Sequence, residues 1–172
     1  MQSFVRRGFQ LRTASLETRI AYSAFLALMV PGVVTLIALS IGRIGLSPHS
    51  IANYYRGGEG EMTFPKNFWQ LMEVSHFHLF TVPVVALILS HLLYATPASV
   101  RARIWLTSML FSGAIIDATA PWAVRYGAGG FACLLLLGWV LLSAGALLVV
   151  AVTLWAMWGP SPLPSGDPLE PE

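Results

Sequence analysis

The stretch Glu73-Val-Ser-His76-Phe-His78-Leu-Phe-Thr-Val-Pro-Val-Val-Ala-Leu-Ile-Leu-Ser-His91 decides the fold. It is long and apolar enough to cross a membrane, yet it carries three of the chain's four histidines. Ionisable side chains are costly in lipid, so they usually face a protein interior, a cofactor or a water-filled path. We therefore expect this segment to be a membrane-spanning helix that holds the functional site.

The composition of the whole chain also indicates a membrane protein. Of the 172 residues, 56% are hydrophobic and only 10% are charged, whereas a soluble domain has roughly 25% charged residues. The single cysteine, Cys133, excludes an internal disulfide and any CxxC motif. The basic residues form no cluster with interleaved aromatics, so no nucleic-acid partner is expected.

Four apolar runs predict an all-α, integral membrane protein, an antiparallel bundle of four transmembrane helices. Each run has about 20 residues, the length that crosses a hydrocarbon core of roughly 30 Å. The third run is the shortest, and a proline-rich acidic tail over residues 159–172 is expected to be disordered. The spans are expected at about 20–41, 68–94, 104–121 and 131–158, with a basic segment at 1–19 and an ordered loop at 42–67.

The distribution of arginines predicts the orientation. Lys and Arg are enriched in cytoplasmic segments, and the densest cluster precedes the first span: Arg6, Arg7, Arg12 and Arg19. We therefore expect a multi-pass protein of the bacterial inner membrane, with both termini cytoplasmic and the 42–67 loop periplasmic. The first span is expected to remain as an uncleaved anchor, because a signal peptide has a shorter apolar core of about 7–15 residues.

Helical geometry gives the histidine segment two faces. Glu73, His76 and His91 share one stripe, and His78 lies about 160° from His76. His76 and His91 are about 22 Å apart along the axis, so they cannot share a small metal ion. Glu73 and His76 also form an E-x-x-H motif, which occurs in pairs in di-metal helical bundles. A homodimer would supply the second motif.

The spacing of these histidines resembles that of the b-type cytochromes of respiratory chains, in which two histidines on one membrane helix ligate two stacked haems. The resemblance implies haem b, ligated by His76 and His91, with His78 as the alternative on the other face. Ligation by two histidines needs a facing histidine, and the other spans contain none. A second copy or another membrane subunit would then supply it, or Met29 or Met109 would serve.

A second resemblance concerns topology. The segment Ser75-His-Phe-His-Leu-Phe80, after a loop ending in Phe64-Pro-Lys66, is similar to a group of small four-span bacterial inner-membrane proteins. This resemblance covers most of the chain. It implies the four-span topology and no particular chemistry.

The third span carries one carboxylate, Asp117, expected near the periplasmic end at the depth of Glu73 and His76. Such a group could accept the second ring N–H of a histidine and orient it. Alternatively, it pairs with Arg125 or caps a broken helix. In the fourth span, Gly138 and Gly145 are seven residues apart, so they share a face and suit close helix contact. Trp139 lies deeper in the span and is expected to be a packing residue.

The leading functional hypothesis is a small cytochrome-b-like subunit that binds haem and passes electrons between the quinone pool and a periplasmic redox partner, such as a cytochrome. An electron-transfer or accessory subunit is favoured over a stand-alone enzyme. A second hypothesis is a non-catalytic accessory or assembly subunit that packs against a larger membrane complex. A third is a periplasmic-side metal or proton site built from Glu73, His76 and Asp117.

Overall fold

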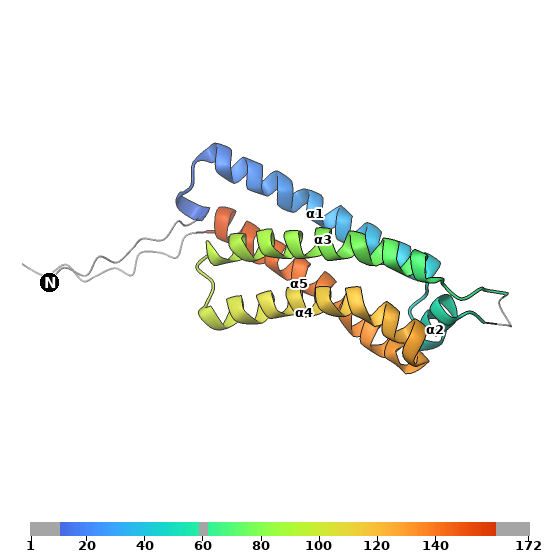
Figure 1. Ribbon diagram of the computed structural model, residues 1–172. Coiled ribbons are helices and arrows are strands. Elements are labelled where there is room, and N and C mark those ends of the chain that lie inside the picture. Colours follow the sequence, from blue (N-terminus) through green and yellow to red (C-terminus); the bar gives the residue numbers. More distant parts are fainter. Residues whose placement is uncertain (1–10, 59–61, 161–172) are drawn as a thin grey trace, which may run out of the picture.

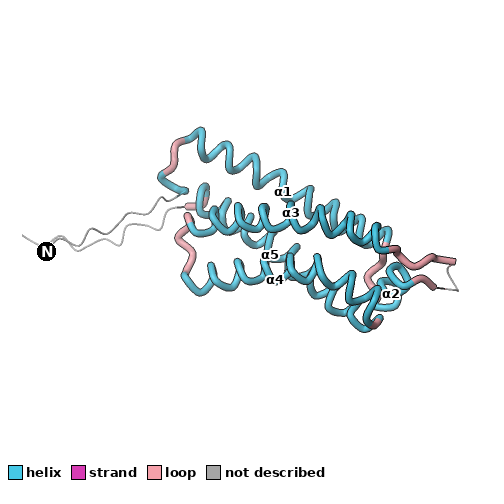
Figure 2. Tube along the Cα trace, in the orientation of Figure 1, coloured by secondary structure: helices cyan, strands magenta, loops and turns pink. Residues whose placement is uncertain are grey.

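Four long helices and one short helix form an elongated bundle in the computed structural model, which describes residues 11–58 and 62–160 (Figures 1 and 2). The described chain begins and ends at the same end of the bundle, and α2 lies at the other (Figure 1). The predicted all-α, four-helix membrane architecture is confirmed. The helices are α1 (Leu16–Arg43), α2 (Pro48–Arg56), α3 (Phe68–Tyr94), α4 (Val100–Trp122) and α5 (Ala132–Trp158).

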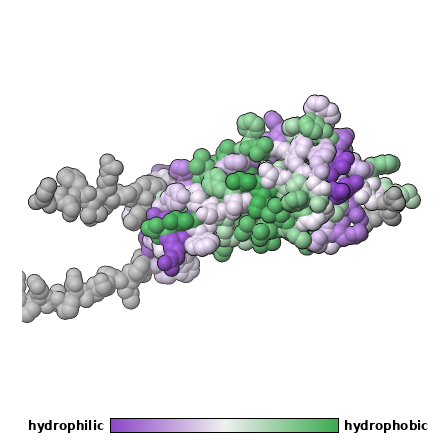
Figure 3. All heavy atoms as spheres, turned by 60° about the horizontal axis from the view of Figure 1, so that its bottom comes forward, coloured by the Kyte–Doolittle hydropathy of each residue, from purple (hydrophilic) through white to green (hydrophobic). Residues whose placement is uncertain are grey.

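The four long helices are the membrane spans, since all four are long and apolar enough to cross a bilayer. Hydrophobic side chains gather over the middle of the molecule and hydrophilic ones lie toward both ends (Figure 3). This distribution is the one that a bilayer requires, with an apolar belt between two polar rims. Of the predicted segments, residues 1–10 and 161–172 lie outside the described residues.

The third span differs most from its predicted limits. Helix α4 begins at Val100 because Ser99 caps it, its side chain accepting the backbone N–H of Ala102. Pro121 was expected to end the span, but α4 continues to Trp122 and then into a single π-helical turn, η3 (Ala123–Gly127). A proline within a helix removes the hydrogen bond to the carbonyl four residues back and crowds that carbonyl; at Pro121 this carbonyl belongs to Asp117.

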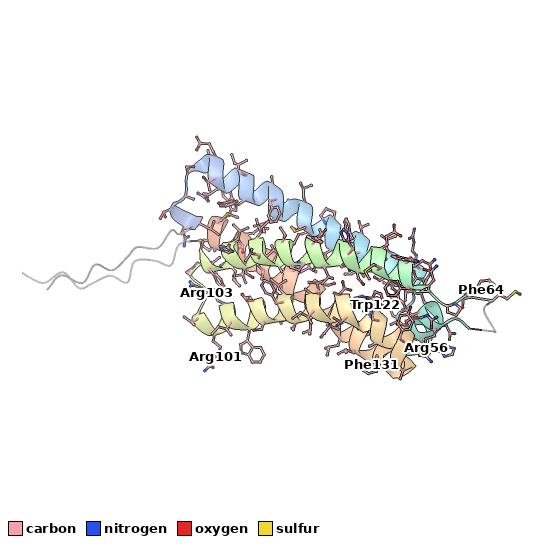
Figure 4. The ribbon with its side chains drawn as sticks, viewed as in Figure 1. Arg56, Phe64, Arg101, Arg103, Trp122 and Phe131 are labelled. Carbon is pink, nitrogen blue, oxygen red and sulfur yellow. The ribbon has the colours of Figure 1, made fainter. Side chains whose placement is uncertain are left out.

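Helix α2, within the predicted 42–67 loop, was not anticipated. Ser47 and Ser50 form a reciprocal capping box, and Pro48 occupies the first turn, where its missing N–H costs nothing. Arg56 then joins α2 to the far end of α4: its Nη1 donates to the carbonyls of Val124 at 3.1 Å and Gly127 at 3.0 Å. Helix α2 therefore closes one end of the bundle (Figure 4).

Packing is tightest between α4 and α5. A Cβ placed on Gly113 would lie 2.7 Å from the backbone N of Leu142, and one on Gly138 would lie 2.6 Å from a side-chain carbon of Ile116. The predicted close contact at Gly138 and Gly145 is confirmed, since Gly145 packs on Met109 and Leu110. Helix α1 packs more loosely, since Leu26 is its buried residue. Near its N-terminal end it is joined to α5 by the bonds of Arg19 to the Met157 carbonyl and of Trp158 Nε1–H to Ser23 Oγ.

Candidate functional site

The interior of the bundle contains one histidine–carboxylate pair. His78 Nδ1 lies 2.6 Å from Asp117 Oδ2, linking α3 to α4. Asp117 is only 8% exposed, and a buried carboxylate is tolerated only when hydrogen bonds or an opposite charge replace water. The imidazole therefore donates its Nδ1–H to the carboxylate. The ring's other nitrogen, Nε2, has no partner among the described residues.

The second oxygen of Asp117 is also used. Trp139 donates its indole Nε1–H to Asp117 Oδ1 at 3.1 Å, so the carboxylate joins α3, α4 and α5. Nearby, Trp122 donates its indole Nε1–H to Ser75 Oγ at 2.6 Å, a second polar link between α4 and α3. The carboxylate is thus held at both oxygens and the orientation of His78 is fixed.

A cavity of about 350 Å³ opens onto this pair. Its volume lies within the roughly 300–1,000 Å³ of small-molecule sites. The walls come from every long helix and from α2. The lining includes Leu36, Leu39 and Ser40 from α1, Tyr54 and Tyr55 from α2, Val74 and His78 from α3, Asp117 from α4 and Trp139 from α5.

Charged side chains lie at the end of the cavity nearest α2. Arg43, Lys66 and Glu73 line it there, and Lys66 Nζ sits 4.2 Å from the centre of the Tyr54 ring. Tyr55 is buried in the same wall, and burial, followed by Tyr54 and the Asp117 carboxylate, raises the pKa of its phenol above the ordinary 10.0. Tyr55 is therefore a neutral, uncharged part of the site at physiological pH.

His76 and His91, the first candidates for iron ligation, lie elsewhere. Both are exposed on the outer surface of α3, and neither lines the cavity. His76 and His78 lie on different faces of α3, as predicted, and the face that meets α4 carries His78. His91 donates its Nδ1–H to the Leu87 carbonyl at 2.9 Å, which leaves Nε2 directed away from its own helix. Ligation of haem by these residues stays a prediction.

The structure does not bring Glu73, His76 and Asp117 together. Asp117 contacts His78, Glu73 lines the cavity near its mouth, and His76 stacks obliquely on Phe80, with 5.1 Å between ring centres. Across residues 11–58 and 62–160 no group of three or more His, Cys, Asp or Glu side chains is arranged to hold a metal ion. The alternative pairing of Asp117 with Arg125 is wrong, because Arg125 Nε donates to the Lys66 carbonyl.

Two parts of the site were not expected from sequence. Trp139 was assigned to packing, and its bond to Asp117 has no local signal, since the partners lie 22 positions apart on different helices. The tyrosines of α2 were also missed. Their signal was available in the Ser47-Pro48 start of a helix, which would have placed Tyr54 and Tyr55 one or two turns later.

Fold and site together define a polytopic membrane protein with a polar pocket inside a four-helix bundle. The chain belongs to the Aq_1264_TM family, described as a transmembrane helical domain, which matches residues 45–163. The match covers α2 to α5, including His78, Asp117 and Trp139, and leaves α1 outside it. No curated protein and no solved structure matches the chain.

Proposed function

We propose that the protein is a subunit of a membrane electron-transfer complex, and that the cavity over His78 and Asp117 is its working site. The carrying observation is the 2.6 Å bond between these residues beside a cavity of about 350 Å³. Electron carriers that also exchange protons need a proton acceptor within the low-dielectric region. A histidine backed by a carboxylate supplies one, since the carboxylate fixes the tautomer and stabilises the imidazolium.

If His78 and Asp117 served only to pack α3 against α4, the cavity beside them would have no explanation. Two polar residues that only join α3 to α4 would need no open space beside them. Here His78, whose Nε2 has no partner among the described residues, lines a cavity that Glu73 also lines. A proton released at His78 would thus have a carboxylate on its way to the aqueous phase.

The proposed orientation places the α2 end in the periplasm and the chain in the bacterial inner membrane. Its support is the charge distribution: Arg101 and Arg103 lie at the opposite end (Figure 4), and Arg12 and Arg19 donate there to the carbonyls of Gly159 and Met157. The cavity would then communicate with the periplasmic side, where a redox partner would dock.

The test is electron flow in membranes of cells that carry the gene, its deletion, or His78→Gln. The measured quantity is the rate at which washed membranes reduce an added one-electron acceptor. Both altered strains should lose the activity that depends on this subunit, and His49→Gln, on the exposed surface of α2, should retain it. Equal rates in the wild-type and deletion strains would refute the proposal.

A second candidate function, haem binding, is favoured by the geometry of His91. A ligating histidine normally donates its other ring N–H to a carbonyl or carboxylate, as His91 does to Leu87. Because the chain's other histidines lie on α2 and α3, the second axial ligand would come from a neighbouring chain. Purified protein should then show a reduced b-type absorption band that His91→Ala abolishes, and a colourless preparation after haem supplementation would exclude it.

A further inference from the structure

We propose that the cavity binds the hydroquinone form of a long-tailed quinone, with His78 Nε2 accepting a hydrogen bond from one hydroxyl of the headgroup. This inference rests on the proposed electron-transfer function and names the ligand of the same site. It follows from three features: the direction of the hydrogen bonds at the pair, the shape of the cavity wall, and an apolar groove that continues from it.

The direction of the hydrogen bonds selects a donor ligand. In the neutral imidazole one ring nitrogen carries hydrogen and the other is an acceptor. Nδ1 is committed as a donor by the bond to Asp117 Oδ2, so in the neutral ring, the form that accepts a proton, Nε2 presents a lone pair. A hydroquinone hydroxyl can donate to that lone pair, whereas the carbonyl of the oxidised quinone cannot.

The cavity walls suit a flat, uncharged ring. Leu36, Leu39, Val74, Tyr55 and Trp139 all line the cavity. Apolar and aromatic walls with a few placed polar groups are the usual form of a site for such a ligand. Arg43, Lys66 and Glu73 lie nearer α2, beyond the position of a headgroup bonded to His78. The quinone ring would thus occupy a part of the cavity in which Asp117 is the charged side chain.

A second groove gives the tail a route. It has a volume of about 170 Å³ and an almost wholly apolar wall. Leu36, Ser40 and Trp139 line both this groove and the main cavity, so the two spaces adjoin. The groove continues along α5 past Val140, whose side chain is on the lipid-facing surface. A headgroup at His78 would therefore have its hydrocarbon chain running out into lipid.

One variant should reverse the choice of redox form. In Asp117→Asn, Trp139 still offers an N–H and requires the amide oxygen, because the indole nitrogen is only a donor. The amide NH₂ then faces His78 and donates to Nδ1, which moves the ring hydrogen to Nε2. The site becomes a donor, and the oxidised quinone becomes the favoured ligand.

The experiment is equilibrium binding to the full-length protein in lipid nanodiscs without oxygen. The probes are a decyl-tailed benzoquinone and its hydroquinone. Loss of one hydrogen bond of about 1.4 kcal/mol corresponds to about a tenfold change in affinity. The wild type should therefore bind the hydroquinone about tenfold more tightly, Asp117→Asn should prefer the quinone, and His78→Phe should show no preference. His49→Phe is the matched control and should behave as the wild type.

Two further variants test the tail. Val140→Trp fills the groove and should weaken binding of the decyl-tailed probe but not of the same headgroup without a tail. Leu137→Trp, exposed on the same helix outside the groove, should change neither. Equal affinity for both redox forms in the wild type, or a preference that survives in His78→Phe, would overturn the proposal.

The lipid composition separates this ligand from a phospholipid headgroup. Nanodiscs with and without anionic phospholipid should give the same hydroquinone affinity, and displacement by anionic lipid without any redox preference would assign the cavity to lipid instead. Failure of the two proposals is distinguishable. If membrane electron flow is unchanged by deletion while the redox preference holds, the proposed function is refuted and the ligand assignment is supported.

Discussion

Trp139 and His78 donate hydrogen bonds to the two oxygens of the same carboxylate: the indole N–H to Asp117 Oδ1 at 3.1 Å, and the imidazole N–H to Oδ2 at 2.6 Å. Hydrogen bonds to an ionised group are shorter and stronger than neutral ones. The arrangement removes the rotational freedom of the carboxylate and so determines which nitrogen of His78 remains available.

Removing the indole donor should destabilise the bundle. Trp139→Phe leaves Asp117 Oδ1 without a partner inside the protein, and we expect the free energy of unfolding to fall by about 1–3 kcal/mol, which also includes the lost packing of the larger ring. Unfolding in mixed detergent micelles measures it. The control is Trp155→Phe, because Trp155 is 69% exposed on the lipid-facing surface. A similar change in both variants would contradict the role assigned to the bond.

The close approach of α4 to α5 predicts a cost for any side chain at Gly113. In Gly113→Ala the added Cβ meets the Leu142 backbone at 2.7 Å, and backbone cannot move aside as a side chain can. We expect a loss of about 1–3 kcal/mol in the free energy of unfolding. Gly32→Ala serves as the control, since the nearest atom there is Met29 Cε at 3.9 Å. Its stability should stay within about 0.5 kcal/mol of the wild type.

The attachment of α2 depends on Arg56. Arg56→Ala removes the bonds to the carbonyls of Val124 and Gly127, and each hydrogen bond contributes about 0.5–1.5 kcal/mol. Backbone amides of α2 should exchange with deuterium faster, while those in the middle of α4 should not change. Arg101→Ala, at the opposite end of the bundle (Figure 4), should leave α2 unaffected. Unchanged exchange in the Arg56 variant would show that other contacts hold α2.

Tyr55 should make the protein sensitive to alkali. Its pKa is raised above 10.0 in the folded protein, chiefly by burial, so above that pH the unfolded state loses the phenol proton while the folded state keeps it. The unfolded state then binds fewer protons, and stability falls as pH rises. Tyr55→Phe should reduce this fall in stability. Tyr126→Phe should not reduce it, because Tyr126 is 54% exposed. Unfolding measured across pH 9 to about 12 would reveal the difference.

Much of the fold was predictable because membrane spans are encoded locally. Long apolar runs predicted every span, and Gly138 and Gly145 indicated a close helix contact that the structure confirms. The errors occurred at helix ends and at short polar helices. A proline at 121 does not end α4, and the capping residues Ser47 and Ser50 start a helix that hydropathy alone cannot reveal.

The site was only partly predictable because its partners lie on different helices. The sequence indicated that His76 and His78 point in different directions, and that Asp117 could orient a histidine. It could not indicate which face of α3 meets α4, since α3 is apolar nearly all round. That choice decides between His76 and His78, and it depends on tertiary packing. The bond from Trp139 depends on packing in the same way.

The three-way junction at Asp117 also has a consequence for biogenesis. Spans that enter a bilayer one at a time would let His78 of α3 meet Asp117 as α4 enters, but Asp117 Oδ1 would lack its partner until α5 has been synthesised, because Trp139 belongs to the last span. The junction is therefore complete only after α5 docks on α3 and α4, and until α3 and α4 meet, the neutral acid is the form best tolerated in lipid. Helix α1 contributes no bond to that junction and lies outside the family match. It is joined to α5 by the bonds of Arg19 to the Met157 carbonyl and of Trp158 Nε1–H to Ser23 Oγ, so it completes the cavity wall from outside the junction.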